Sequence, residues 1–130
     1  MSQILSIHHV SVLVSDTQVA LDFYCGVLGL EPDAGRPELD FPGAWLQVGG
    51  QQIHLIALAD PPVVGTTAIR GGRDRHVALR VTDLNAIRSV LVARGIEHNL
   101  SRSGRRALFC RDPDGNALEL IEVPGESSPG

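Results

Sequence analysis

Lysine is absent from the 130-residue chain, and all 11 of its basic residues are arginine. This absence excludes catalysis through a lysine Schiff base and a phosphate-binding loop of the Walker type, since both need a lysine amine. Aromatic residues make up only 4% of the chain. No apolar run approaches the length that crosses a bilayer, and no leader of basic and then apolar residues begins the sequence. We therefore expect no contact with a membrane.

Cysteine is also scarce. Cys25 and Cys110 are the two cysteines, and neither belongs to a CxxC motif, so we expect partly or fully buried thiols rather than disulfides or a cysteine-rich zinc site. The composition favours a soluble, cytoplasmic protein. A net charge of −4 and a pI near 5.6 argue against a nucleic-acid partner. With 43% hydrophobic residues, the chain can fill the core of a single domain over residues 1–130.

The residues that are present form an internal repeat at half the chain's length. Residues 9–16 (HVSVLVSD) align with residues 76–83 (HVALRVTD), and residues 53–55 (IHL) align with residues 118–120 (LEL). A repeat of this kind indicates two copies of one structural unit. We predict repeats over 4–59 and 75–123, joined by a linker over 60–74 that either only connects them or forms a flap beside a cleft.

Four side chains of the type that binds metals occupy equivalent places in the two repeats: His9, His54, His76 and Glu119. Successive residues of a strand point to opposite faces. In each of the four segments the face opposite the candidate ligand is wholly aliphatic, which suits packing under a helix. The mixed face suits a lined cavity. We therefore predict that the four side chains point into one cleft.

The remaining pattern assigns one helix and several strands to each repeat. A strand over 4–14 leads to Asp16, a typical N-cap, and to a helix over 17–28 that ends at Gly29. The later segments are an irregular or short-strand connection over 31–43, a hairpin of 45–48 and 52–56, a strand over 76–82, a helix over 84–94 capped by Asp83, a strand near 96–100, and a hairpin of 107–111 and 117–123. The predicted fold is α+β, with two βαβββ repeats forming curved mixed sheets around a cleft.

Three imidazoles and one carboxylate suit Zn²⁺, Ni²⁺, Fe²⁺, Co²⁺ or Mn²⁺ better than Ca²⁺, which prefers an all-oxygen shell. Any one of these histidines alone would be interpreted as a hydrogen-bonded strand residue. Four coincidences at repeat-related positions favour a metal site instead. Glu119 is a ligand or, equally, a general base that leaves the metal to take a proton.

Other polar and aromatic residues are weaker candidates. An anionic substrate group could be bound by Arg36, Arg80, Arg105 or Arg106, and Arg80 is favoured because it shares a strand face with His76. Trp45 and Phe109 either line an apolar part of the cleft or pack in the core. His8 points away from His9 towards the surface, and His98 is expected to be exposed.

Several segments together resemble the vicinal oxygen chelate superfamily, which comprises glyoxalases, bleomycin-resistance proteins and dioxygenases. The segments that carry the resemblance are residues 9–12, 23–30, 76–79 and 112–120, and it extends over about residues 5–123. The order of the four ligand positions is similar to that of glyoxalase I (lactoylglutathione lyase). Residues 36–46 and 53–55 resemble a glyoxalase-like subgroup of plants and bacteria.

The resemblance implies a divalent metal held by His9, His54, His76 and Glu119, one from each of four strands. It also implies a homodimer whose sites are shared, with two ligands from each subunit. The implied reaction isomerises the hemithioacetal of a 2-oxoaldehyde and a thiol, for example a glutathione adduct, with Glu119 taking a proton and the metal stabilising an enediolate. Glyoxalase I commonly has glutamate at the position of His54, so this site would have one anionic ligand instead of two.

The same superfamily includes other functions. Alternatives are a metal-dependent epimerase, a thiol transferase acting on an epoxide antibiotic, or a ring-cleaving dioxygenase. A further alternative is a binding protein without catalysis that sequesters an antibiotic.

Overall fold

The computed structural model describes residues 2–61, 74–101 and 105–123. The chain divides into two compact units, Met1–Pro62 and Val63–Gly130. Each unit contains a strand, a helix and three further strands, so the predicted α+β fold with two βαβββ repeats is confirmed. The predicted cleft and the single domain stay predictions. Most of the expected linker, residues 62–73, lies outside the described residues.

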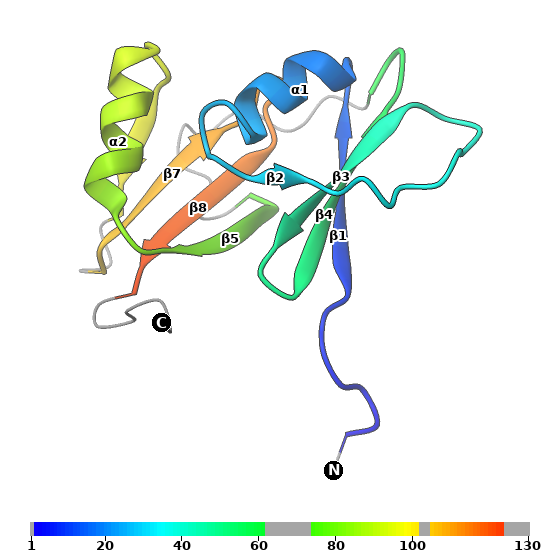
Figure 1. The fold of residues 1–130 in the computed structure, drawn as a ribbon. Coiled ribbons are helices and arrows are strands. Elements are labelled where there is room, and N and C mark those ends of the chain that lie inside the picture. The colour runs from blue at the N-terminus through cyan, green and yellow to red at the C-terminus, as the bar shows by residue number, and fades with distance from the viewer. Residues whose placement is uncertain (1, 62–73, 102–104, 124–130) are drawn as a thin grey trace. The chain divides into compact units, whose positions relative to one another are not determined.

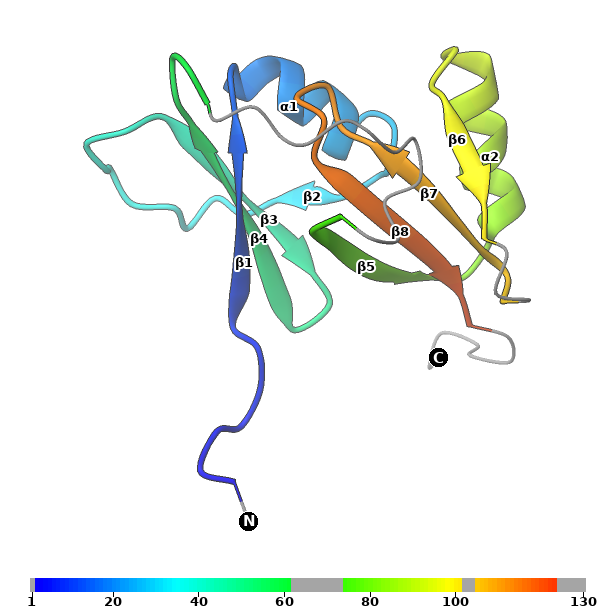
Figure 2. The same cartoon turned by 180° about the vertical axis from the view of Figure 1, so that it is seen from behind.

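The first unit is a four-stranded mixed sheet with one helix (Figures 1 and 2). Its elements are β1 (His9–Val14), α1 (Thr17–Tyr24), β2 (Glu31–Pro32), β3 (Gly43–Val48) and β4 (Gln51–Ala57). The strand order is β1-β4-β3-β2. β1 pairs with β4 in parallel, whereas the other neighbours are antiparallel. This order places the strand of His9 beside the strand of His54.

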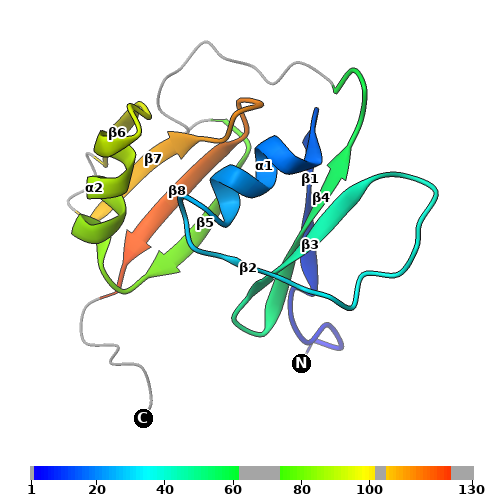
Figure 3. The ribbon, with the colours of Figure 1, turned by 45° about the horizontal axis from the view of Figure 1, so that its top comes forward.

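The second unit repeats the first (Figures 1 and 3). Its elements are β5 (His76–Val81), α2 (Leu84–Ala93), β6 (His98–Leu100), β7 (Ala107–Arg111) and β8 (Ala117–Glu122). The strand order is β5-β8-β7-β6, again with one parallel pair, β5 with β8. The strand of His76 therefore lies beside the strand of Glu119, as the repeat requires.

Both helices begin at the aspartates that the sequence indicated. The carboxylates of Asp16 and Asp83 accept hydrogen bonds from the third amide along, at Val19 and Ala86, each at 3.0 Å. These bonds satisfy amides that have no partner within the helix. α1 ends at Tyr24 and not at residue 28, because the following amides bond in a wider pattern, such as Leu28 N–H to the Phe23 carbonyl at 3.0 Å.

The aliphatic faces of the strands form the buried parts of each unit. In the first unit Val14, Ile53 and Leu55 are almost fully buried, and α1 packs against β3 and β4. In the second unit Leu118 and Leu120 are buried in the same way, and α2 contacts β8. Each sheet thus covers its aliphatic face, and the opposite face carries a mixture of polar and apolar side chains that includes the candidate ligands.

Two further local predictions were wrong. β1 begins at His9 and not at residue 4, because its partner strand begins only at Gln51 and the register pairs His9 with Gln52. Ile4 and Leu5 are consequently 83% and 94% exposed. His98 is half-buried in β6 and not fully exposed, since its Nδ1–H donates to the Ile96 carbonyl at 3.0 Å.

The cysteines match their interpretation as thiols without a disulfide partner. Cys110 in β7 is buried, and burial raises the pKa of its thiol to about 12, so it stays protonated near neutral pH. Cys25, at the end of α1, is half-buried. In the part of the chain that the structure describes, no helix combines the length and the apolar character needed to cross a bilayer.

Candidate functional site

The first unit brings His9 and His54 together. Their rings stack with centroids 3.9 Å apart and planes 14° apart, and the opposite face of His54 stacks on Trp45 with centroids 4.3 Å apart. The β3–β4 register places Trp45 directly opposite His54. His54 is 9% exposed, whereas His9 is exposed. The imidazole of His54 is therefore the middle layer of a three-ring stack.

The edge of the His54 ring is held by a hydrogen-bonded chain that leads to a carboxylate. His54 Nε2 lies 2.8 Å from Gln52 Oε1, and Gln52 Nε2 donates to Asp33 Oδ2 at 2.5 Å. Burial, followed by the neighbouring His9 and His8, lowers the pKa of His54 below its ordinary value. A lowered pKa keeps the ring neutral near pH 7, with a nitrogen lone pair that a metal can use.

The second unit brings His76 and Glu119 together. His76 Nε2 lies 3.2 Å from Glu119 Oε1. His76 Nδ1–H donates to the Asp74 carbonyl at 2.8 Å, since a carbonyl oxygen can only accept. The Nε2 of a neutral His76 therefore presents a lone pair to a carboxylate, and these two groups need a proton or a metal cation between them.

The separation of these two atoms suits a metal ion. Bonds of about 2.1 Å from a nitrogen and an oxygen to one ion leave the two donors about 3.0 Å apart at an octahedral angle and about 3.4 Å apart at a tetrahedral angle. The observed distance is 3.2 Å. Donation of the other ring nitrogen to a backbone carbonyl is also the usual way in which a metal-binding histidine is oriented. His76 and Glu119 fit a shared cation without rearrangement.

Glu119 is buried on β8, with 4% of the residue exposed. Its second carboxylate oxygen, Oε2, accepts from Arg105 Nη2 at 3.0 Å. Phe109 lies opposite it on β7 and contacts the edge of the His76 ring, with centroids 5.8 Å apart. Glu119 is thus a carboxylate with one oxygen held by an arginine and the other turned to a histidine.

A second arginine supports His76 indirectly. Arg111 Nη1 donates to Asp74 Oδ2 at 3.0 Å and to the Gly115 carbonyl at 2.8 Å. The hydrogen bond from Arg111, followed by that from the Arg75 amide, lowers the pKa of Asp74. Because the carbonyl of the same Asp74 accepts from His76, the Arg111 contact fixes the residue that orients the imidazole.

The first pair fits one ion only after one ring turns. A ring nitrogen directs its lone pair in the plane of the ring, and the two stacked planes are nearly parallel. His54 is held on both faces and at one edge. His9 is exposed, and besides His54 its described ring contact is with His8, whose Nδ1 lies 2.8 Å from the Nδ1 of His9. The prediction that His8 points away from His9 was therefore wrong. His9 is therefore the ring that can turn.

Each unit alone supplies two of the four predicted donors. Within the described ranges, no three of the histidine, cysteine, aspartate and glutamate side chains gather closely enough to hold a metal ion. The structure places His9 against His54 and His76 against Glu119, and the role of each pair as metal ligands stays a prediction. A single site made by all four stays a prediction.

The other candidates differ in their surroundings. Arg36 Nη2 donates to the Phe41 carbonyl at 2.7 Å, and its guanidinium lies over the Phe41 ring, so this arginine holds the connection between β2 and β3. Arg80 is exposed on β5. Arg106 Nε donates to Glu122 Oε1 at 2.6 Å, three residues beyond Glu119. Arg105 differs from these three arginines in that it donates the hydrogen bond described above to Glu119, a predicted metal ligand.

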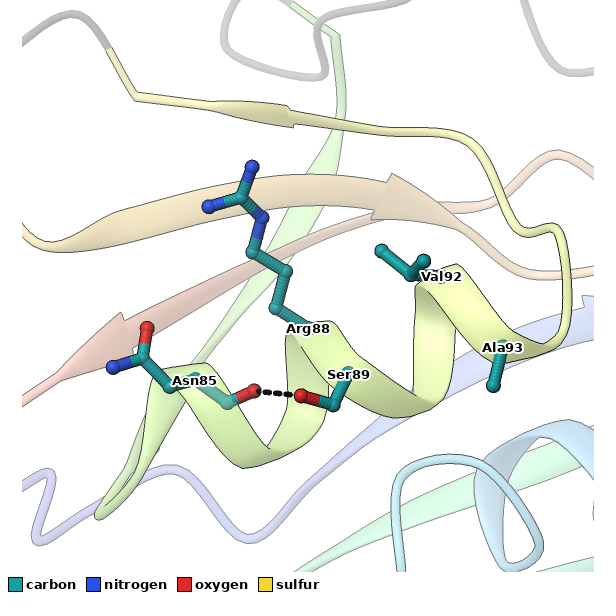
Figure 4. Close-up of a pocket in the computed structure, with 5 residues that line it drawn as sticks. All are labelled: Asn85, Arg88, Ser89, Val92 and Ala93. Atoms are coloured by element: carbon teal, nitrogen blue, oxygen red, sulfur yellow. Dashed lines mark hydrogen bonds between the residues drawn. The ribbon is translucent and has the colours of Figure 1, made fainter.

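A surface depression of about 510 Å³ lies along α2, apart from these pairs (Figure 4). Its lining residues are Asn85, Arg88, Ser89, Val92 and Ala93. Ser89 Oγ donates to the Asn85 carbonyl at 3.0 Å within the helix. The lining contains none of the predicted metal ligands, so we assign it no part in the candidate site.

Sequence reasoning missed the supporting residues Asp33, Gln52, Asp74 and Arg111. Gln52 could have been found, because it lies two residues before His54 and so shares its strand face. Asp74 lies two residues before His76, but its contact uses the backbone carbonyl, which leaves no signal in the residue type. Asp33 follows a two-residue strand within a connection that the sequence predicts only as irregular or a short strand, so its partners could not be predicted.

Comparison with known protein families assigns the chain to one of them. The profile of the Glyoxalase/Bleomycin resistance protein/Dioxygenase superfamily matches residues 6–120, nearly the whole chain. The chain belongs to this superfamily. The family resemblance of the sequence is thereby confirmed.

Individual relatives support the same assignment. Glyoxylase I 4 of Arabidopsis thaliana is 30% identical over 120 residues, which cover 88% of this chain and 69% of the relative. A glyoxalase family protein from Bacillus anthracis has a similar solved structure, with a TM-score of 0.75, 24% identity, and coverage of 94% and 98% of the two chains. TnmS3, an antibiotic binding protein from Streptomyces sp. CB03234, has a TM-score of 0.68 at 26% identity over 94% and 98%.

Proposed function

We propose that this superfamily member is a divalent-metal-dependent enzyme of the glyoxalase I type. Its substrate would be the hemithioacetal of a 2-oxoaldehyde and a thiol such as glutathione. The observation that carries the proposal is the contact of His76 Nε2 with Oε1 of the buried Glu119, matched in the other unit by the contact of His9 with His54. The similarity to Glyoxylase I 4 supports this choice of reaction.

The ligands of the metal would be His9, His54, His76 and Glu119, two from each unit. Their imidazoles and carboxylate suit Zn²⁺, Ni²⁺, Fe²⁺, Co²⁺ or Mn²⁺. The two pairs would complete one site either within a chain or between the chains of a homodimer. Bound there, the cation would polarise the substrate carbonyl and offset negative charge that develops on its oxygen.

Glu119 would move the proton. Released from the metal, its Oε1 would take the proton from the carbon that carries the hydroxyl and the sulfur and return it to the former carbonyl carbon, while the hydroxyl proton passes to the former carbonyl oxygen, so no oxidant or reductant is consumed. Arg105 would hold Oε2 and so fix the direction of the carboxylate. Trp45 and Phe109 would form apolar walls that exclude water. Arg80, and less directly Arg36, would attract an anionic part of the substrate.

The test is turnover of methylglyoxal with glutathione by metal-stripped protein resupplied with Ni²⁺, Zn²⁺ or Mn²⁺. We expect activity with at least one ion, and a loss of kcat of about 10²–10⁴-fold in Glu119→Gln, which removes a general base. Glu97→Gln, an exposed carboxylate beyond α2, is the matched control and should retain activity. No turnover with any of the three ions would contradict the proposal.

A second candidate is an antibiotic-binding protein without catalysis. The similarity to TnmS3 and the flat stack of Trp45, His54 and His9, which a planar ligand could extend, favour it. Equilibrium dialysis separates the two candidates. A protein that takes up none of the transition metals would favour this second function, whereas uptake of one ion per site supports the first. Epimerase, epoxide thiol transferase and dioxygenase activities on the same metal site would be separated by their substrates.

A further inference from the structure

We infer that Asp33 and Gln52 are positioning residues that fix which nitrogen His54 offers to a metal. Asp33 orients the amide of Gln52, Gln52 holds the proton of His54 on Nε2, and Nδ1 remains as the donor nitrogen. This inference rests on the proposed function, because it assigns His54 its part in the metal site.

The chain of hydrogen bonds has one possible direction, which begins at the carboxylate. Asp33 Oδ1 accepts from the Gly35 amide at 2.8 Å, and Oδ2 accepts from Gln47 Nε2 at 2.7 Å and from Gln52 Nε2. An ionised carboxylate can only accept, so the NH₂ group of Gln52 must face Asp33. The carbonyl end of the same amide then faces His54.

That orientation fixes the imidazole proton. Gln52 Oε1 lies 2.8 Å from His54 Nε2, and because an amide oxygen only accepts, Nε2 must carry the hydrogen. The neutral ring therefore has its lone pair on Nδ1. A 180° flip of the ring would put Cε1 in the place of Nε2 and so break this hydrogen bond within a stack closed by Trp45 and His9.

The second unit makes the opposite choice. His76 donates from Nδ1 to the Asp74 carbonyl, which leaves Nε2 directed at Glu119. A site made by both units would therefore use Nδ1 of His54 and Nε2 of His76. Residues that orient metal-binding histidines in this way typically change metal affinity by about 10–100-fold when they are replaced.

The experiment is long-range ¹H–¹⁵N correlation NMR of the histidine rings in metal-free protein, paired with Zn²⁺ and Co²⁺ titrations. In the unaltered protein we expect the His54 signal of a ring protonated at Nε2. In Gln52→Leu we expect a mixture of tautomers or the Nδ1–H form, with metal affinity about 10–100-fold weaker. Gln51→Leu is the control, since it is an exposed glutamine one position earlier on β4, on the opposite face, and should change neither signal nor affinity.

A double variant guards against a simple packing defect. Asp33→Asn with Gln52→Glu exchanges the carboxylate and the amide. The glutamate at position 52 still accepts from His54 Nε2–H, and the asparagine at position 33 donates to that glutamate. We expect this pair to restore the Nε2–H signal. An Nδ1–H ring in the unaltered protein, or the same behaviour for Gln52→Leu and Gln51→Leu, would overturn the inference. Failure of the unaltered protein to bind metal would instead refute the proposed function, and the metal-free NMR signal would still decide the position of the proton.

Discussion

Glu122, at the end of β8, joins three parts of the second unit through one side chain. Its Oε1 accepts from Arg106 Nε at 2.6 Å, and its Oε2 accepts from the Leu84 amide at the start of α2 at 2.9 Å. The hydrogen bond from Arg106, followed by that from Leu84, lowers the pKa of Glu122 below its ordinary value. Its ionised form therefore stabilises the fold more than its neutral form does.

The pH dependence of stability follows from this lowered pKa. A carboxyl whose pKa is lower in the folded than in the unfolded chain adds stability above the unfolded pKa, of about 4.3, and loses it as pH falls through the folded pKa. We expect Glu122→Gln to lower the urea midpoint more at pH 7 than at pH 3. Glu97→Gln, as control, should show a smaller change with pH. An equal loss for Glu122→Gln at both pH values would contradict this role.

At the scale of residues, the sequence pointed to candidate ligands but not to the contacts that surround them. His9, His54, His76 and Glu119 stand out because the repeat aligns them. The contact between Arg105 and Glu119 could not be predicted, because Arg105 lies before β7 and its direction depends on the path of the loop. A strand period determines the face of a residue within a strand and says nothing of a loop side chain.

At the scale of elements, β3 and β4 carry most of the first unit's candidate site, and Gly43 sets how closely they approach. A Cβ at Gly43 would lie 2.1 Å from the Leu55 carbonyl oxygen, which belongs to the backbone of β4 next to His54. Backbone cannot move aside as a flexible side chain can. Glycine at the start of β3 is therefore needed for the pairing that brings Trp45 against His54.

A matched pair of substitutions tests this close approach. We expect Gly43→Ala to destabilise the protein by about 1–3 kcal/mol, as overpacking at an immovable neighbour does. Gly50→Ala, in the turn between the same strands, should have little effect because nothing lies within 4 Å of its Cβ position. Chemical denaturation measures both. Equal stability of the two variants would contradict the assigned role of Gly43.

The element predictions succeeded where periodicity and caps acted together. Asp16 and Asp83 begin their helices as expected, and both hairpins form where the sequence placed them. The prediction for residues 4–8 failed because a strand also needs a partner, and β4 begins too late to provide one. Alternation of apolar residues predicts a strand's faces but not the length of the neighbouring strand.

At the scale of the whole molecule, the repeat predicted two like units, and these are present. It also predicted one donor pair in each unit; the two side chains of each pair lie in contact, and their role as metal donors stays a prediction. Whether the two pairs bind the same metal ion cannot be predicted from the repeat. It depends on an interface between folded units, or between chains, whose side chains follow no period in the sequence. A direct measurement of metal binding therefore tests whether the four side chains bind one ion.

That measurement is a Co²⁺ titration followed by visible absorption, with the unaltered protein, the double variant His9→Ala/His54→Ala, and the double variant His76→Ala/Glu119→Gln. If both units supply ligands to one ion, the unaltered protein should bind one Co²⁺ per set of four donors, and either double variant should lose the absorption bands. A double variant that retained the bands with unchanged affinity and stoichiometry would show that one pair binds without the other, and would contradict the account.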